Sequence, residues 1–180
     1  MKRKITLSCE IPEGVECSYE KGIFICRKGE ISNSRKIEIP GAKIEITKNK
    51  VEIIKERGNK KDNALIATNI AHIRNAISGL ENKFIYEMEI CHVHFPMGVK
   101  VQEKEIIIDN FLGEKFKRRA RILDKVDVEI KGNKIFLSGN DLEKVGQTAA
   151  NIEKATKVPK KDRKIFQDGI FIVSKDGRAV

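Results

Sequence analysis

The sequence predicts an α+β fold made by duplication, in which two similar units each pack an antiparallel β-sheet against one amphipathic helix. Two observations predict this fold. Segments of the first half recur in the second half at a constant spacing, and in each half an alternating pattern of apolar residues is followed by a helical one. We therefore expect an N-terminal unit in residues 1–82 and a C-terminal unit in residues 83–180.

The repeat keeps its register across strands, a hairpin and a helix. Three pairs of positions illustrate it: residues 11–15 with 95–99, residues 44–51 with 128–135, and Asp62 with Asp141. The first two pairs are 84 positions apart, and the third pair is 79 positions apart. We interpret this change of spacing as a loop in residues 57–61 that is five residues longer in the first unit.

Each unit has the pattern of strands followed by one helix. Residues 44–53 and 126–137 alternate between apolar and polar side chains around a polar turn, which is typical of β-hairpins. Apolar residues with helical spacing follow in each unit: Ile66, Ile70, Ile73 and Ile77 in the first, and Leu142, Val145, Ala149 and Ile152 in the second. We expect Asp62 and Asp141 to cap the starts of these helices, and Gly79 to follow the end of the first.

The charge balance favours a polyanionic partner. The chain has 36 Lys and Arg against 26 Asp and Glu, which gives a net charge of +10 and a pI near 9.4. Each phosphate that Lys or Arg neutralises releases counterions, so an excess of this size favours nucleic acid. We find neither a basic amphipathic helix nor a long apolar run, and therefore expect no membrane partner.

The sequence offers little for catalysis or metal binding. We expect the four cysteines, Cys9, Cys17, Cys26 and Cys91, to be small core residues of a cytoplasmic protein, because the chain starts without a signal-peptide pattern. His92 and His94 share one face of a strand while Cys91 faces the other, which is too few ligands for a zinc site. With neither a nucleophile motif nor a glycine-rich phosphate loop, we expect no enzyme and no cofactor.

Positive charge is clustered in the second half, although each unit carries a net charge of +5. Residues 115–121 contain five positive charges and no acid, and residues 157–164 contain five around Asp162. These clusters predict contacts with RNA phosphates, although a solvated charged face is the alternative for any one such run. Since the pattern also predicts that Phe84, Tyr86 and Phe171 lie in the core, we expect backbone contacts more than base stacking.

Gly146 and Gln147 lie early in the second predicted helix. Small residues there allow either a close approach to RNA at the helix start or simple packing of the helix on the sheet. The sequence leaves both interpretations open.

Four motifs resemble the large-subunit ribosomal protein six family, called protein nine in eukaryotes. They are residues 94–97 (His-Phe-Pro-Met), 110–115 (Asn-Phe-Leu-Gly-Glu-Lys), 145–153 and 166–170. The resemblance extends over essentially the whole chain and is closest to the archaeal and eukaryotic branch. It implies two sheet-and-helix units, no catalytic activity, and a second unit that contacts large-subunit ribosomal RNA near the sarcin-ricin loop and the base of the factor-binding stalk.

By the resemblance and the charge pattern together, we expect the RNA-binding residues in the second unit. They are Asn110, Lys115, Lys117, Arg118, Arg119, Arg121, Gln147, Lys157, Lys160, Lys161, Arg163 and Lys164. The implied partners are large-subunit ribosomal RNA and neighbouring ribosomal proteins, with neither DNA nor membrane. A free-standing RNA chaperone or regulator with the same fold is the alternative. Residues 26–30 depart from the usual hairpin of the family, so the resemblance does not support an RNA contact there, and whether the first unit contacts RNA stays open.

Overall fold

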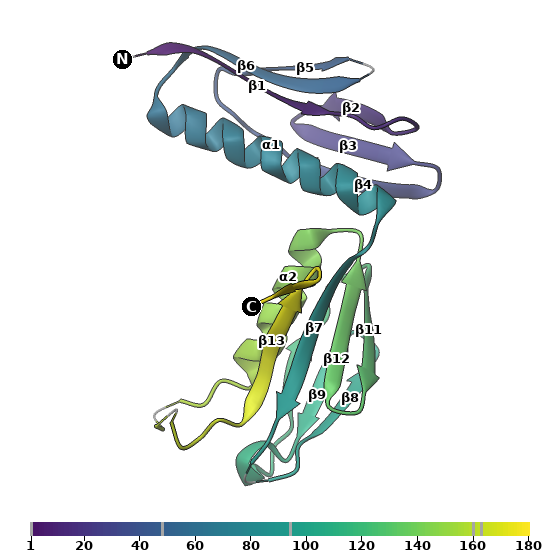
Figure 1. Cartoon of the computed structure of the whole chain (residues 1–180), viewed down its shortest axis with the longest axis vertical. Coiled ribbons are helices and arrows are strands. Elements are labelled where there is room, and N and C mark those ends of the chain that lie inside the picture. Colours follow the sequence, from purple (N-terminus) through teal and green to yellow (C-terminus); the bar gives the residue numbers. More distant parts are fainter. Residues whose placement is uncertain (1, 48, 94, 160, 163) are drawn as a thin grey trace. The chain divides into compact units, whose positions relative to one another are not determined.

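The computed structural model describes the whole chain except residues 1, 48, 94, 160 and 163. The chain forms two compact units, Met1–Asn82 (unit 1) and Lys83–Val180 (unit 2). Both units combine antiparallel sheets with one helix, so the predicted duplicated α+β fold is confirmed (Figure 1). Each unit, however, contains two separate sheets instead of the single sheet that the strand pattern suggested.

Unit 1 packs its helix against two three-stranded sheets. In chain order its elements are β1 (Arg3–Glu10), β2 (Glu16–Glu20), β3 (Ile23–Lys28), β4 (Ile31–Lys36), β5 (Lys43–Thr47), β6 (Lys50–Gly58) and α1 (Lys60–Glu81). The sheets have the strand orders β1-β6-β5 and β2-β3-β4. All four isoleucines of the predicted apolar stripe on α1 are buried in the core, which confirms the face of the helix that packs on the strands.

Unit 2 repeats this arrangement and extends it. Its elements are β7 (Phe84–Cys91), β8 (Gly98–Gln102), β9 (Glu105–Asp109), a 3-10 turn (Phe111–Gly113), β10 (Arg118–Arg121), β11 (Val126–Lys131), β12 (Lys134–Gly139), α2 (Leu142–Ala155), β13 (Gly169–Lys175) and β14 (Arg178–Ala179). The sheet β10-β9-β8 corresponds to β4-β3-β2 of unit 1. The other sheet, β11-β12-β7-β13-β14, corresponds to β5-β6-β1 with two strands added.

The two units differ most in two connections. Strands β3 and β4 are joined by residues 29–30, whereas the corresponding strands β9 and β10 are joined by residues 110–117. In addition, α1 leads directly into β7, whereas residues 156–168 separate α2 from β13. The predicted basic cluster at residues 115–121 begins in the first of these connections, and the cluster at residues 157–164 lies within the second.

Three details of the sequence interpretation are wrong. Asn59, not Asp62, caps α1: its side chain accepts from the backbone N–H of Asp62 at 3.0 Å, and Asp62 accepts in return from the N–H of Asn59 at 2.8 Å. Gly79 lies inside α1, which continues to Glu81. The additional residues 57–61 form the end of β6 and the start of α1 instead of a loop.

One of the aromatic residues that were predicted to lie in the core is exposed instead. Phe84 and Tyr86 are buried, but the side chain of Phe171 lies on the outer face of its sheet and is 43% exposed. All four cysteines are unpaired thiols, and Cys9, Cys17 and Cys26 lie in or beside the core of unit 1. Cys91, which was also predicted to be a core residue, is only partly buried and lines a pocket instead. Burial raises the pKa of Cys26 to about 12 and that of Cys17 to about 11, so both stay protonated and unreactive at neutral pH.

Candidate nucleic-acid interface

The side chain of Arg118 joins the two cationic stretches of unit 2. Its guanidinium group donates two hydrogen bonds to the carboxylate of Glu114, from Nε at 2.8 Å and from Nη2 at 2.6 Å. The remaining nitrogen, Nη1, donates to the backbone oxygens of Ala155 at 2.8 Å and Lys157 at 3.2 Å. The group also lies 4.2 Å from the ring centre of the buried Phe111. Arg118 therefore ties the loop before β10 to the end of α2.

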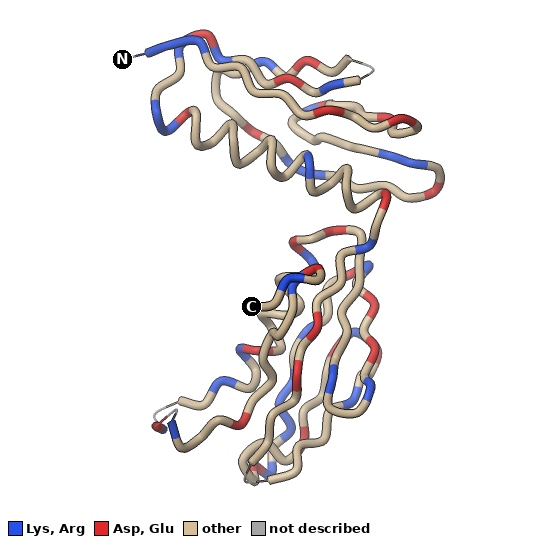
Figure 2. The backbone as a smooth tube through the Cα atoms, in the orientation of Figure 1, with Lys and Arg blue, Asp and Glu red and all other residues tan. Residues whose placement is uncertain are grey.

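The surroundings of Glu114 show that the two stretches are close in space. Hydrogen bonding from Arg118 lowers the pKa of Glu114, and the positive charges of Arg118 and Lys161 lower it further. Lys161 belongs to residues 156–168, so the second cationic stretch contributes to the electric field at the base of the first. We call the combined surface of the 110–121 and 156–168 segments the unit 2 cationic surface (Figure 2).

Arg118 is therefore an internal support, and this changes its predicted role. Its donors are engaged within the protein, and its side chain is 22% exposed. Neighbouring residues of a strand face opposite sides, so Arg119 and Arg121 face away from α2, on the outer side of β10. Arg119 lies 3.7 Å from Glu105, and Lys117, just before the strand, lies 3.4 Å from Asp109.

Five exposed cations carry the positive charge that stays available on this surface. They are Lys115, Arg121, Lys157, Lys161 and Lys164, and none of them has an ion-pair partner among the residues that the structure describes. Lys161 lies over the ring of Phe166, 4.3 Å from its centre. Lys160 and Arg163, which were also predicted to contact RNA, lie outside the described residues.

Asn110 and Gln147 have structural partners. Asn110 adopts a left-handed backbone conformation (φ 56°), and its amide donates to the backbone oxygen of Pro96 at 2.9 Å. It therefore shapes the start of the loop. Gln147 is exposed on α2 and donates to Asn151 at 2.9 Å. A Cβ atom on Gly146 would lie 3.7 Å from the hydroxyl oxygen of Tyr86, so this glycine favours the packing interpretation.

Phe116 is a candidate residue that the sequence interpretation missed. Its side chain is 87% exposed, the largest fraction among the exposed large hydrophobic residues of the described chain, and it lies between two exposed lysines. Since a lone apolar residue in a sequence carries no signal of exposure, only the structure identifies it. An exposed aromatic ring beside lysines can stack on a nucleobase.

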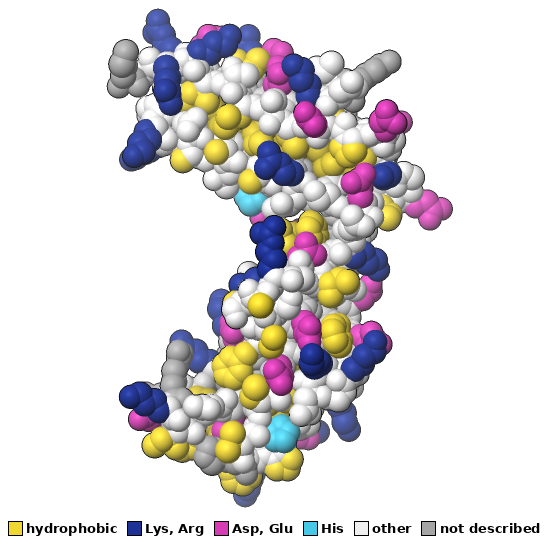
Figure 3. All heavy atoms as spheres, viewed as in Figure 1, with side chains coloured by type: hydrophobic (Ala, Val, Ile, Leu, Met, Phe, Trp, Pro, Cys, Tyr) yellow, Lys and Arg dark blue, Asp and Glu magenta, His cyan; other side chains and the backbone are white. Residues whose placement is uncertain are grey.

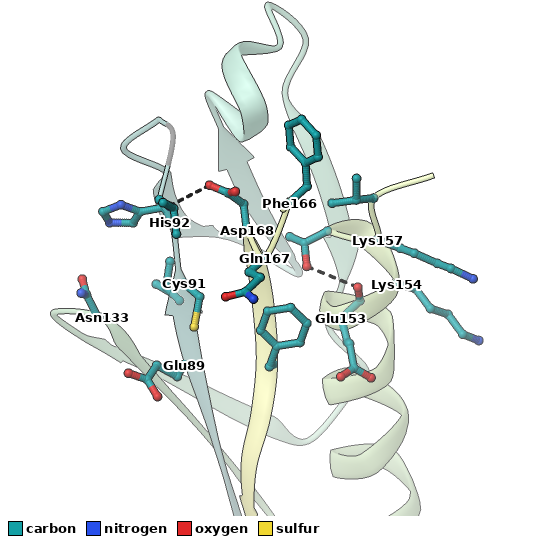
Figure 4. Close-up of a pocket in the computed structure, with 15 residues that line it drawn as sticks. Glu89, Cys91, His92, Asn133, Glu153, Lys154, Lys157, Phe166, Gln167 and Asp168 are labelled. Carbon is teal, nitrogen blue, oxygen red and sulfur yellow. Dashed lines mark hydrogen bonds between the residues drawn. The ribbon is translucent and has the colours of Figure 1, made fainter. Parts of the chain in front are cut away.

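A pocket of about 1020 Å³ lies between the end of α2 and strands β7 and β13 (Figure 4). Its side chains have mixed charge, with Glu89 on β7 and Glu153, Lys154 and Lys157 at the end of α2. The buried carboxylate of Asp168 accepts from the backbone N–H of Val93 at 2.8 Å and so closes one side. Within the described residues, no group of three or more His, Cys, Asp or Glu could hold a metal ion.

The outer face of the five-stranded sheet is not cationic. In Figure 3, hydrophobic side chains lie there among acidic and basic ones, over β7, β12 and β13. Ile85, Phe171 and Val173 are its exposed hydrophobic residues, and Lys134 is paired with Glu87. This face differs from the unit 2 cationic surface in having its charges largely balanced. None of the described helices is both long and apolar enough to span a membrane.

Comparison with known proteins gives a consistent family. A family model for ribosomal protein L6 matches residues 95–169, a range that contains both cationic clusters. The large ribosomal subunit protein uL6 of Methanosarcina mazei is 43% identical, over 97% of this chain and 99% of the relative. The chain belongs to the ribosomal protein L6 family. The proteins of the same name from Archaeoglobus fulgidus (42%, 92% of this chain and 87% of the relative) and Methanobrevibacter smithii (41%, 93% and 94%) support the archaeal branch.

Membership of the L6 family agrees with the predicted absence of catalysis. Proteins of this family are structural ribosomal proteins, so the chain is not an enzyme. The residues around the pocket need no catalytic role, and burial raises the pKa of the Cys91 thiol that lines it, which disfavours the nucleophilic thiolate. The feature of this L6 chain that remains to be explained is its cationic surface.

The contact between Glu114 and Arg118 predicts a pH-dependent loss of stability in the variant Glu114→Gln. At neutral pH the variant should lose up to about 1 kcal/mol of unfolding free energy, as for other partly exposed ion pairs. Since Arg118 holds the pKa of Glu114 below its ordinary value of 4.5, the carboxylate stabilises the fold above that value, and this contribution disappears as the pH falls through the lowered pKa.

Urea denaturation at several pH values measures this difference. The curves of wild type and Glu114→Gln should converge in acid, whereas the exposed control Glu103→Gln should match the wild type throughout. A gap between wild type and Glu114→Gln that stays constant down to acid pH would show that the ionised carboxylate is not what stabilises the loop.

Proposed function

We propose that the chain is a structural constituent of the large ribosomal subunit that binds large-subunit ribosomal RNA through the unit 2 cationic surface. The observation that carries the proposal is the Arg118 side chain, which fastens two lysine-rich segments, distant in sequence, into one surface. The names of the archaeal relatives, which are large ribosomal subunit proteins, support the same assignment.

The mechanism is electrostatic and depends on a rigid loop. Lys115, Lys157, Lys161 and Lys164 neutralise phosphates where RNA strands approach one another, and the release of counterions drives binding. Arg118 fixes the loop in advance, so little conformational entropy is lost when RNA binds. Such contacts position the protein on folded RNA without reading its sequence.

The position on the ribosome follows from the family and is part of the same proposal. The resemblance of residues 110–115 and 145–153 to the L6 family implies a site near the sarcin-ricin loop and the base of the factor-binding stalk. At this site unit 2 supports translation by holding RNA junctions in place, beside neighbouring ribosomal proteins, in cytoplasmic ribosomes. Hydroxyl-radical footprinting of bound ribosomal RNA tests this position directly.

Fractionation of cell extracts separates this function from that of a free-standing RNA chaperone or regulator. A ribosomal constituent should sediment with large subunits in a one-to-one ratio and should remain with them through a high-salt wash. Quantitative mass spectrometry of gradient fractions measures the ratio. A protein found mainly in the ribosome-free fractions would instead fit the regulator.

Removal of three lysines should weaken RNA binding and reduce its salt dependence. In the variant Lys115→Gln, Lys161→Gln, Lys164→Gln, the slope of log affinity against log salt should fall by about two to three, because each phosphate contact contributes about 0.7–0.9. The control variant replaces Lys83, Lys104 and Lys131, which lie in the same unit but in ion pairs. Filter binding to purified archaeal large-subunit RNA provides the measurement, and equal slopes for the two variants would exclude the proposed surface.

Phe116 should add base stacking to these phosphate contacts. The substitution Phe116→Ala should weaken binding by about five- to 150-fold without changing the salt slope, since stacking contributes about 1–3 kcal/mol per base. The chain contains no tryptophan, so Phe116→Trp introduces a unique fluorophore that a stacked base quenches. Phe171→Trp, on the outer sheet face, is the control and should keep its fluorescence. Equal responses of the two tryptophans to RNA would remove Phe116 from the interface.

A further inference from the structure

The net positive charge of unit 1 is concentrated at one end of the unit. Its cations there come from two parts of the chain: Lys2, Arg3 and Lys4, and Lys55, Arg57, Lys60 and Lys61. The same stretches contain two acids, Glu56 and Asp62, so this end carries +5. The other basic and acidic residues of unit 1 number nine each and cancel. We call this group the cationic end.

The fold brings these two parts of the sequence together. Strand β1 pairs antiparallel with β6, and Arg3 lies opposite Gly58, after which α1 starts at Lys60. A register shift between Arg3 and Ile5 leaves both Arg3 and Lys4 exposed. Figure 3 shows dark blue side chains gathered around the N-terminal end of this unit.

Most of these cations form no ion pair with another described residue. Lys55 is largely buried and bonded to Asp62 at 2.8 Å, and Lys4 lies 3.4 Å from Glu56. The other five cations are exposed and have no ion-pair partner among the described residues: Lys2, Arg3, Arg57, Lys60 and Lys61. Lys2 nevertheless acts on Asp62 from a distance, since its charge helps to lower the pKa of that carboxyl.

The fold itself does not require these charges, as the internal duplication shows. Strand β7 pairs with β12 as β1 pairs with β6, and Phe84 stands in the place of Ile5. Asn82 and Lys83 therefore stand in the place of Arg3 and Lys4, and Lys83 is paired with Asp127. Between the end of β12 at Gly139 and the first turn of α2, the chain contains the acids Asp141 and Glu143 and no cation before Lys144. The same frame is therefore built without a cationic end.

We infer that the cationic end of unit 1 is a second RNA-binding surface, which contacts phosphates independently of the unit 2 cationic surface. Its composition favours RNA over a protein partner, because lysine is depleted and aromatic anchors are enriched where proteins meet. Among the described residues of unit 1, the exposed large hydrophobic ones are Ile23, Ile31 and Leu65, and none belongs to the cationic end. A dense cluster of cations without apolar anchors suits the sugar-phosphate backbone.

This inference rests on the proposed function only for the identity of the RNA as ribosomal. It predicts that the full-length variant Arg57→Gln, Lys60→Gln, Lys61→Gln binds purified archaeal large-subunit RNA with a salt slope about two to three smaller than that of wild type. The matched control, Arg27→Gln, Lys36→Gln, Lys43→Gln, removes one arginine and two exposed lysines from the balanced part of unit 1. It should keep the wild-type slope. Circular dichroism of all three proteins verifies that they are folded.

Crosslinking of the purified large subunit adds a second readout. Ultraviolet irradiation followed by mass spectrometry should give RNA adducts on peptides that contain residues 2–4 or 55–61. The inference is overturned if the two variants have equal slopes, or if peptides that contain these residues carry no RNA adducts while peptides of the unit 2 cationic surface do. If the wild-type protein itself fails to bind the RNA, the proposed function fails as well. If the unit 2 lysine variant lowers the salt slope as expected but the variant Arg57→Gln, Lys60→Gln, Lys61→Gln keeps the wild-type slope, the inference is overturned and the proposed function stands.

Discussion

One guanidinium group determines the local structure on which the unit 2 cationic surface depends. Arg118 has five N–H donors in a planar fork, and the structure uses this fork in two directions at once. Nε and Nη2 donate to the carboxylate of Glu114, and Nη1 donates to the backbone oxygens of Ala155 and Lys157 at the end of α2. Lysine could not do this, because its ammonium group is a point charge without a planar fork. Arg118 holds a cationic loop in one conformation despite the repulsion among its lysines.

The duplication explains where the positive charge is placed. In unit 2, the 110–121 and 156–168 segments together carry a net +7, so the rest of the unit carries −2. In unit 1, the cationic end carries the whole +5. The repeated strands instead alternate lysines with acids, as in the pairs Lys131–Glu129 and Lys50–Glu52. The shared frame is thus nearly neutral, and the excess cations lie in stretches where the two copies differ.

Much of this fold could be predicted from the sequence, because strands and helices leave periodic traces. The stripe from Ile66 to Ile77 identified the buried face of α1, and the constant spacing of 84 residues identified the repeat. The capping residue of α1 could not be identified with the same certainty. Asn and Asp both favour the N-cap position, and whether Asn59 or Asp62 occupies it depends on the residue at which β6 ends. The separation into two sheets depends on tertiary pairing and leaves no periodic trace.

The cationic surface was predictable as composition but not as geometry. Five cations in residues 115–121 indicate an anion-binding segment, yet strand alternation directs Arg118 inward and Arg119 outward. A basic run therefore contains two kinds of residue, those whose charge stays exposed and those that hold the others in place. Only the hydrogen bonds seen in the structure distinguish these two kinds of residue, since Arg118 and Lys115 look equivalent in the sequence. Among the described residues of this surface, the cations without an ion-pair partner are Lys115, Arg121 and the lysines after α2, and these charges are the ones that RNA phosphates can neutralise.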